Sequence, residues 1–382
     1  MNHLHQVPNT QVSRQDGRTA AGLQAERERD NKSKSAPTLR GVYSRYNTFP
    51  KGVVRRIGLL ACSATLVLAG VVRVAAQAGT PRDAPEMTYD PSMLVGVTLD
   101  PSVRASVGEA LQGRQYDRAE AILLDQHNKN PNSAPLLALL GRIFFLDGKF
   151  ENCAIALKKA DKLSPLEDRC RFTLAMAYMA MKRPGWARPE IEKLMQADPN
   201  KALYPYWLSR LDYHDMHMVE AVTHVQRAIQ LDPNFMKAYD NLGLYLEGLG
   251  KFDEAIRAYQ NAIRLNRANS LHSPWPTHNL GALLSKLGRL DEAEPYLRES
   301  LREDPRFPKA YFQLGLLLEK RLKDNDAVQA LKQAIAFDPD YAEPYFILGK
   351  ILQRQHDAAA AQQAFEAFEK LKNNDKMRNL TE

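Results

Sequence analysis

One phrase recurs along this chain at a fixed step, and it constrains the fold more than any other feature. The segment KFDEAIRAYQNAI at 251–263 has near-copies at 217–229 and 289–301. Aligning the phrase over the whole sequence gives one small residue per copy, at Ala119, Cys153, Ala187, Ala221, Ala255, Ala293, Ala327 and Ala361. These residues are 34 positions apart, with a single step of 38. A fixed period of this length indicates a supersecondary unit that is stacked many times.

Each copy is predicted to hold two helices. In residues 236–269, the first helix has an inner face with helical spacing, made of Tyr239, Leu242, Gly243 and Leu246. The second helix follows a break at Gly248 and Gly250 and carries Ala255 on its inner face. Gly243 and Ala255 are small because the two helices approach closely there. A helix pair buries only one side by itself, so neighbouring units must stack.

The 34-residue helix–turn–helix unit resembles the tetratricopeptide repeat (TPR) family. The resemblance rests on the Leu-Gly pair of the first helix, the small residue of the second helix and a proline that closes most units. It covers eight units in residues 100–375, with one four-residue insertion at 270–273, and the units at 100–133 and 168–201 match least well. The resemblance implies an all-α fold, a right-handed α-solenoid built as a superhelix of helix pairs.

The residues before the repeats predict an export segment. An uncharged, mostly apolar run begins at Ile57 directly after Arg55 and Arg56, and the segment ends in the small-residue sequence Ala76-Gln77-Ala78. This order is typical of a cleaved secretory signal over 57–78. A retained membrane anchor over the same residues is the alternative. Both interpretations place the repeats outside the cytoplasm, in the periplasm or the extracellular space.

Composition separates the remaining segments. Residues 1–56 are basic and polar, which is typical of a disordered leader or of a start codon assigned too far upstream. We expect a linker over 79–99 and a tail over 376–382. Residues 1–78 carry twelve Lys and Arg against four acidic residues, an excess larger than the +7 formal charge of the whole chain. The repeats are therefore close to neutral, and no nucleic-acid partner is expected. A membrane would be contacted only through an uncleaved 57–78.

The sequence holds none of the common motifs of nucleotide-binding, phosphate-binding or zinc-dependent catalytic sites. We therefore expect no enzymatic activity, no cofactor and no metal. The cluster with the most ligand-like chemistry is His214 and His217 in the turn of the fourth unit, with His224 on the next helix. Imidazole suits copper or zinc, but histidine is also an ordinary surface residue. Cys153 and Cys170 are expected to be buried thiols, and whether they pair is open.

The resemblance implies that the first helix of each unit lines a concave groove that binds a protein or peptide. The predicted groove residues are Arg142, Phe145, Phe172, Met176, Tyr206, Arg210, Tyr213, Asp240, Asn241, His278, Asn279, Phe312 and Gln313. The amides Asn241, Asn279 and Gln313 each offer a donor and an acceptor to an extended peptide backbone. Their alternative role is to bond neighbouring helices or water. The aromatic and methionine side chains have an alternative role too, as core between units.

Three functions remain open. The first is an exported, non-catalytic scaffold that binds an extended peptide or an envelope partner in its groove. The second is a membrane-anchored envelope assembly factor that works through its convex or end surfaces. The third is a periplasmic metal-binding protein that uses the three histidines. The sequence leaves the identity of the partner and the oligomeric state open.

Overall fold

The computed structural model describes residues 90–381, and it describes the side chains of 90–374. The predicted basic leader at 1–56, the signal or anchor at 57–78 and the first part of the linker, 79–89, lie outside the described residues. Within the part of the chain that is described, no helix combines the length and the apolarity needed to cross a bilayer.

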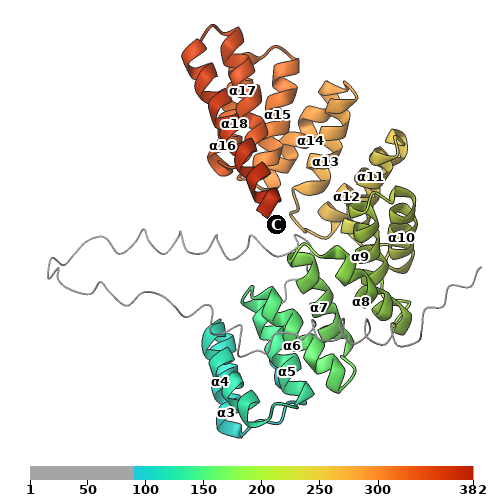
Figure 1. Ribbon diagram of the computed structural model, residues 1–382. Helices are drawn as coiled ribbons and strands as arrows, with labels where there is room; N and C mark the ends of the chain where they lie inside the picture. The colour runs from blue at the N-terminus through green and yellow to red at the C-terminus, as the bar shows by residue number, and fades with distance from the viewer. Residues whose placement is uncertain (1–89, 382) are drawn as a thin grey trace, which may run out of the picture. The chain divides into compact units, whose positions relative to one another are not determined.

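The described chain is a succession of helices without strands, which confirms the predicted all-α solenoid (Figure 1). After a short 3-10 helix η2 (Pro91–Leu94), sixteen α-helices follow one another: α3 (Pro101–Gln112), α4 (Tyr116–Lys129), α5 (Ala134–Leu146), α6 (Phe150–Leu163), α7 (Asp168–Ala180), α8 (Pro184–Ala197), α9 (Leu203–His214), α10 (Met218–Leu231), α11 (Met236–Gly248), α12 (Phe252–Ala268), α13 (Trp275–Lys286), α14 (Leu290–Glu303), α15 (Pro308–Lys320), α16 (Asp324–Phe337), α17 (Ala342–Arg354) and α18 (Ala358–Thr381). They pack as antiparallel pairs, from α3 with α4 to α17 with α18.

The turn inside each pair has the same backbone conformation. One residue per turn is left-handed, with φ between 54° and 78°: Arg114, Gly148, Lys182, Met216, Gly250, Gly288, Leu322 and His356. The N–H of the following residue donates to the carbonyl five positions earlier, for example from Lys149 to Phe144 at 2.8 Å. This is the hydrogen bond that closes a Schellman-type helix end. Each turn therefore has the same conformation, which preserves the period of the repeat. Glycine occupies only three of the eight left-handed turn positions.

The Leu-Gly pair is a packing device, as the sequence predicts. A Cβ atom added to Gly243 would lie 2.5 Å from the ring of Tyr259 on the partner helix, and one added to Gly281 would lie 2.8 Å from Leu297. Ala255 is fully buried in the same contact. A larger side chain at these places would force the two helices apart.

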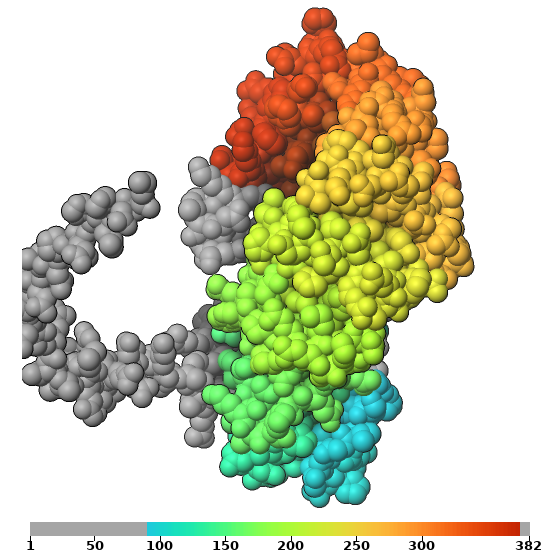
Figure 2. Space-filling view, turned by 90° about the vertical axis from the view of Figure 1, so that its right-hand side faces the viewer, coloured from blue at the N-terminus to red at the C-terminus, as the bar shows by residue number. Residues whose placement is uncertain are grey.

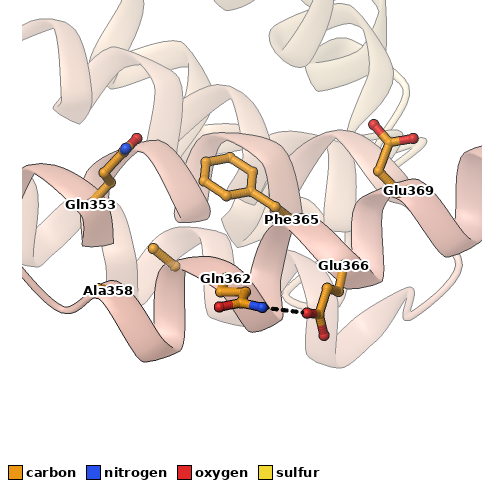
Figure 3. Close-up of a pocket in the computed structure, with 7 residues that line it drawn as sticks. Gln353, Ala358, Gln362, Phe365, Glu366 and Glu369 are labelled. Atoms are coloured by element: carbon orange, nitrogen blue, oxygen red, sulfur yellow. Dashed lines mark hydrogen bonds between the residues drawn. The ribbon is translucent and has the colours of Figure 1, made fainter.

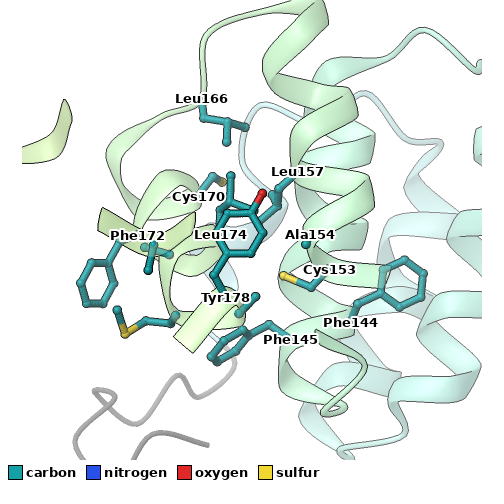
Figure 4. Packing of buried hydrophobic residues seen from close by; sticks show 14 of the residues in the cluster. Phe144, Phe145, Cys153, Ala154, Leu157, Leu166, Cys170, Phe172, Leu174 and Tyr178 are labelled. Atoms are coloured by element: carbon teal, nitrogen blue, oxygen red, sulfur yellow. The ribbon is translucent and has the colours of Figure 1, made fainter. Parts of the chain in front are cut away.

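Neighbouring pairs bury their remaining apolar faces against one another. On one face of the molecule, the helix pairs follow each other in chain order (Figure 2). Cys153 on α6 and Cys170 on α7 are both free, buried thiols within the core cluster shown in Figure 4. The third unit departs from the repeat pattern because Arg171 replaces the expected apolar residue. Its guanidinium bonds Asp161 at 2.9 Å and Glu190 at 2.7 Å, so the contact between α6, α7 and α8 is partly ionic.

The four-residue insertion forms a fixed loop between α12 and α13. Asn266 makes two hydrogen bonds with the backbone of Ser273, each 3.0 Å long. His272 contacts Glu303 at 3.0 Å. The loop is therefore tied to both neighbouring units.

The outer side of α18 carries polar residues at positions that are apolar in an earlier unit. In α16, Val328 and Ile335 pack in a cluster shared with α17. The equivalent positions of α18, one 34-residue step later, are Gln362 and Glu369. They line a hollow of about 440 Å³, in which Gln362 donates to Glu366 at 2.8 Å (Figure 3). A polar outer side is what the terminal unit of a repeat array requires.

Helix α18 runs on through Thr381, so the described part of the predicted tail continues the last helix. Phe368 in α18 packs on Phe346 of α17, with ring centroids 5.2 Å apart.

Part of the predicted linker is ordered. Residues 90–97, here called the strap, lie before the first unit and bury Met93, Leu94 and Val97. Arg104 of α3 donates to the carbonyl oxygens of Leu94 at 2.6 Å and Val97 at 2.5 Å. The strap also reaches the third unit, because Asp90 pairs with Arg169 at 3.1 Å.

Candidate functional site

The predicted groove residues all lie on first helices, but the structure divides them into two groups. The buried group is Phe145, Phe172, Met176, Tyr206, His278 and Phe312. The partly exposed group is Arg142, Arg210, Tyr213, Asp240, Asn241, Asn279 and Gln313. Only the second group has side chains that a partner could reach without a rearrangement.

The buried aromatic residues join consecutive first helices. The ring of Phe172 on α7 lies 6.2 Å from that of Trp207 on α9, and Tyr206 lies 4.7 Å from Phe235, which precedes α11. Aromatic pairs at such separations stabilise packing beyond the area that they bury. In this structure these residues pack in the core between units. That was one of the two roles that the sequence allowed, the other being a groove lining.

The amide residues occupy equivalent positions on three successive first helices, α11, α13 and α15, which contact one another in order. Asn279 donates its amide nitrogen to the Asp240 carboxylate at 3.0 Å. Asn241 lies beside Tyr245, and its hydrogen bond opposes the rise in the pKa of Tyr245 that burial causes. Within residues 90–374, Gln313 makes no side-chain hydrogen bond, so no described residue engages its donor or its acceptor.

Less polar residues with exposed surface follow Gln313 on the first helices α15 and α17. Leu316 is half-buried, Phe346 is 41% exposed and Lys350 is exposed. We call Asp240, Asn241, Asn279 and Gln313, together with Leu316, Phe346 and Lys350, the amide face. It offers hydrogen bonds to a backbone at one end and apolar and cationic contacts at the other.

The three histidines considered for metal binding have different surroundings in the structure. His224 bonds the buried carboxylate of Asp212 at 2.6 Å, and Arg188 bonds the same carboxylate at 2.8 Å. His214 contacts Asp215 at 3.1 Å, and His217 is exposed. Among the described residues, these histidines do not form a group of three or more ligand atoms close enough to hold one ion.

A different cluster, Asp117, Glu120 and Asp147, does bring three carboxylates together. Lys149 already fills its centre, with its Nζ 2.6 to 2.8 Å from all three. Burial raises the pKa of Glu120 to about 7, although Lys149 opposes this. The three acids raise the pKa of Lys149 despite its own burial. The cluster is thus an internal ion pair network, and no periodic pattern of residues predicted it.

Comparisons with known proteins agree with this architecture. Residues 234–302 match a family model described as "Tetratricopeptide repeat", and residues 323–355 match one described as "TPR repeat". The chain is 30% identical over 97 residues to the small glutamine-rich tetratricopeptide repeat-containing protein 2 of Mycosarcoma maydis. That alignment spans 24% of this chain and only 26% of the relative.

Two solved structures share the fold at low sequence identity. Yeast Tom70 is similar over 75% of this chain and 64% of its own, with a TM-score of 0.54 and 16% identity. The Cut9–Hcn1 hetero-tetramer of the APC/C is similar over 68% of this chain and 51% of its own, with a TM-score of 0.53 and 16% identity.

Proposed function

The chain is a tetratricopeptide repeat protein, and from this premise we propose that it is an exported, non-catalytic scaffold that binds an extended peptide on its amide face. The TPR fold supports a role in protein–protein interaction, because stacked helix pairs present long, continuous surfaces. The choice of the amide face rests on one observation. Gln313 makes no side-chain hydrogen bond within residues 90–374, and the half-buried Leu316 lies one turn further along the same helix.

The spacing of the first helices suits an extended chain. Packed helices lie about 8–10 Å apart. An extended peptide advances about 3.3 Å per residue, so each first helix meets roughly every third residue of the ligand. Asn241, Asn279 and Gln313 would then contact the backbone at three successive points, independently of the ligand's sequence. Selectivity would come from Phe346 and Lys350, which favour an apolar and an acidic side chain near one end of the peptide.

The Asp240–Asn279 pair supports this arrangement by orienting Asn279. Because its amide nitrogen is held by Asp240, its oxygen remains available to accept a backbone N–H. A pre-oriented side chain loses less conformational entropy when a ligand binds.

The test uses the full chain and a library of fluorescent peptides of about nine residues, screened by anisotropy. We expect Gln313→Ala, alone or with Asn241→Ala, to weaken the best ligand several-fold, because about one hydrogen bond is lost at each site. Gln329→Ala is the matched control, since Gln329 is an exposed amide on the second helix α16. Equal affinity of all variants would remove the amide face from the proposal.

Export is proposed from residues 57–78 alone. Sequencing the N-terminus of the protein isolated from its native source tests it. A mature chain that begins at Gly79 supports a cleaved signal, and a chain that retains 57–78 in the membrane fraction supports the anchored alternative. A chain found only in the cytoplasm would contradict both.

A further inference from the structure

A second hollow lies at the other end of the molecule, beneath the strap. Its volume is about 180 Å³, and it is lined by the strap, the beginning of α5 and the corner between α6 and α7. The corner carries Leu166 and Cys170, which belong to the core cluster drawn in Figure 4. Because the strap covers one side, a ligand here would be held between two parts of the chain far apart in sequence.

The lining is mostly apolar and contains two charged side chains. Met93 and Val97 of the strap, with Leu139 and Leu166, supply apolar contacts. The charged residues are Arg142 and Glu167. They do not form an ion pair with each other, since no salt bridge joins them within the described chain.

Arg142 is a half-buried arginine on the first helix α5. Within residues 90–374, no hydrogen bond or ion pair joins its guanidinium to another residue, and burial lowers its pKa. The nearby acid Asp90 is already engaged, by Arg169 at 3.1 Å and by Ser92 at 2.6 and 2.9 Å. A partly desolvated guanidinium with open donors is a strong site for a planar, two-oxygen anion.

We propose that this hollow binds a small carboxylate, with the carboxylate oxygens on Arg142 and a short apolar tail against Met93, Leu139 and Leu166. A volume of about 180 Å³ corresponds to roughly six water-sized groups, at about 30 Å³ each. Butyrate, a four-carbon acid, has that size. The same chemistry is presented by a free short-chain acid and by the C-terminal carboxylate of a peptide. The site is separate from the amide face and does not depend on it.

Replacing Glu167 should change the affinity for a carboxylate in the opposite direction to replacing Arg142. Glu167 lines the same hollow, so its negative charge should weaken the binding of an anion there. It stands at the N-cap of α7, but its side chain makes no capping hydrogen bond. Replacing it with glutamine therefore removes the repulsion without removing a cap.

Calorimetric titration of the full chain with butyrate, and with the neutral butyramide, tests the site. We expect butyrate to bind and butyramide not to bind. Arg142→Gln should weaken butyrate about tenfold or more, the value of a charge-assisted hydrogen bond pair, and Glu167→Gln should strengthen it several-fold. Arg227→Gln, which removes an exposed cation from the second helix α10, should change nothing. Amide exchange of the strap should slow when butyrate is bound.

Two further arms complete the test. If Arg142→Gln does not fold, Ala138→Leu, which fills the hollow from α5, should abolish binding instead. A short peptide with a free C-terminus is compared with its amidated form. Tighter, Arg142-dependent binding of the free peptide identifies a chain end as the source, and preference for butyrate identifies a free acid. Equal binding of butyrate and butyramide, or binding unchanged by both Arg142→Gln and Glu167→Gln, would overturn the proposal.

Discussion

The amide of Asn279 on α13 donates to the carboxylate of Asp240 on α11 across a distance of 3.0 Å, and this bond joins two successive first helices. It is partly buried and involves a charged acceptor, so its loss should be measurable. We expect a coupling free energy of about 1 kcal/mol between Asp240→Ala and Asn279→Ala in a double-mutant cycle of urea unfolding. Additive effects of the two substitutions would show that the bond does not hold the two helices together.

The turn at Leu322 predicts a substitution that stabilises the protein. Leu322 has φ of 55°, where a side chain costs about 1 kcal/mol or more, and it is 79% exposed, so little packing is lost when it is removed. Leu322→Gly should therefore raise the free energy of unfolding by roughly 0.5–1 kcal/mol, after the greater chain entropy of glycine is counted.

The control for this prediction is the equivalent turn residue Gly250, at φ of 73°. Gly250→Ala should destabilise the protein by about 1 kcal/mol. Thermal unfolding that moves in the same direction for both variants would contradict the strain argument.

Glu120 predicts a pH dependence of stability. Burial raises its pKa from an ordinary value of 4.5 to about 7 in the folded protein. The folded state then holds a proton that the unfolded state has released, so this contribution to stability is complete below about pH 4.5 and is lost as the pH rises to about 7. Its size is on the order of 2 kcal/mol.

Glu120→Gln removes this titration but keeps a hydrogen-bonding side chain of the same shape. Urea unfolding of both proteins at pH 5 and pH 8 measures the effect. We expect the variant to gain stability relative to the wild type as the pH rises. A stability difference that is the same at both pH values would refute the assignment to Glu120.

The polar outer side of α18 predicts the state of association. Gln362→Val with Glu369→Ile restores the apolar residues that α16 has at the equivalent positions, Val328 and Ile335. This change should create an exposed apolar surface, and sedimentation velocity should detect more self-association than in the unchanged chain. The control is Gln363→Val, at an exposed neighbouring position of the same helix. Association of all three proteins to the same extent would contradict the capping role.

The fold could be predicted from the sequence because one period repeats with little interruption. Gly243 and Ala255 identify the inner faces of a pair without any knowledge of its neighbours, since both must be small where the helices cross. The family matches at 234–302 and 323–355 fall on the units in which this pattern is clearest.

The site could be predicted only in part. A first helix contacts the first helices on both sides. The face that carries the predicted groove residues therefore contains both core and surface residues. Phe172 and Tyr206 therefore could not be distinguished from exposed residues such as Phe346 by spacing alone. The strap was missed because 90–97 has no periodic pattern, and one of its anchors, Arg169, is 79 positions away from Asp90 in sequence.

The most direct test of the central claim is site-specific photo-crosslinking in the native source. A photoreactive residue is placed at Gln313 on the amide face, or at Gln329 on the second helix α16, and crosslinked partners are identified by mass spectrometry. We expect one protein or peptide to be crosslinked from position 313 and not from position 329, and Asn241→Ala to reduce its yield. A partner crosslinked from position 329 and not from 313 would contradict the account and move the binding surface to the second helices.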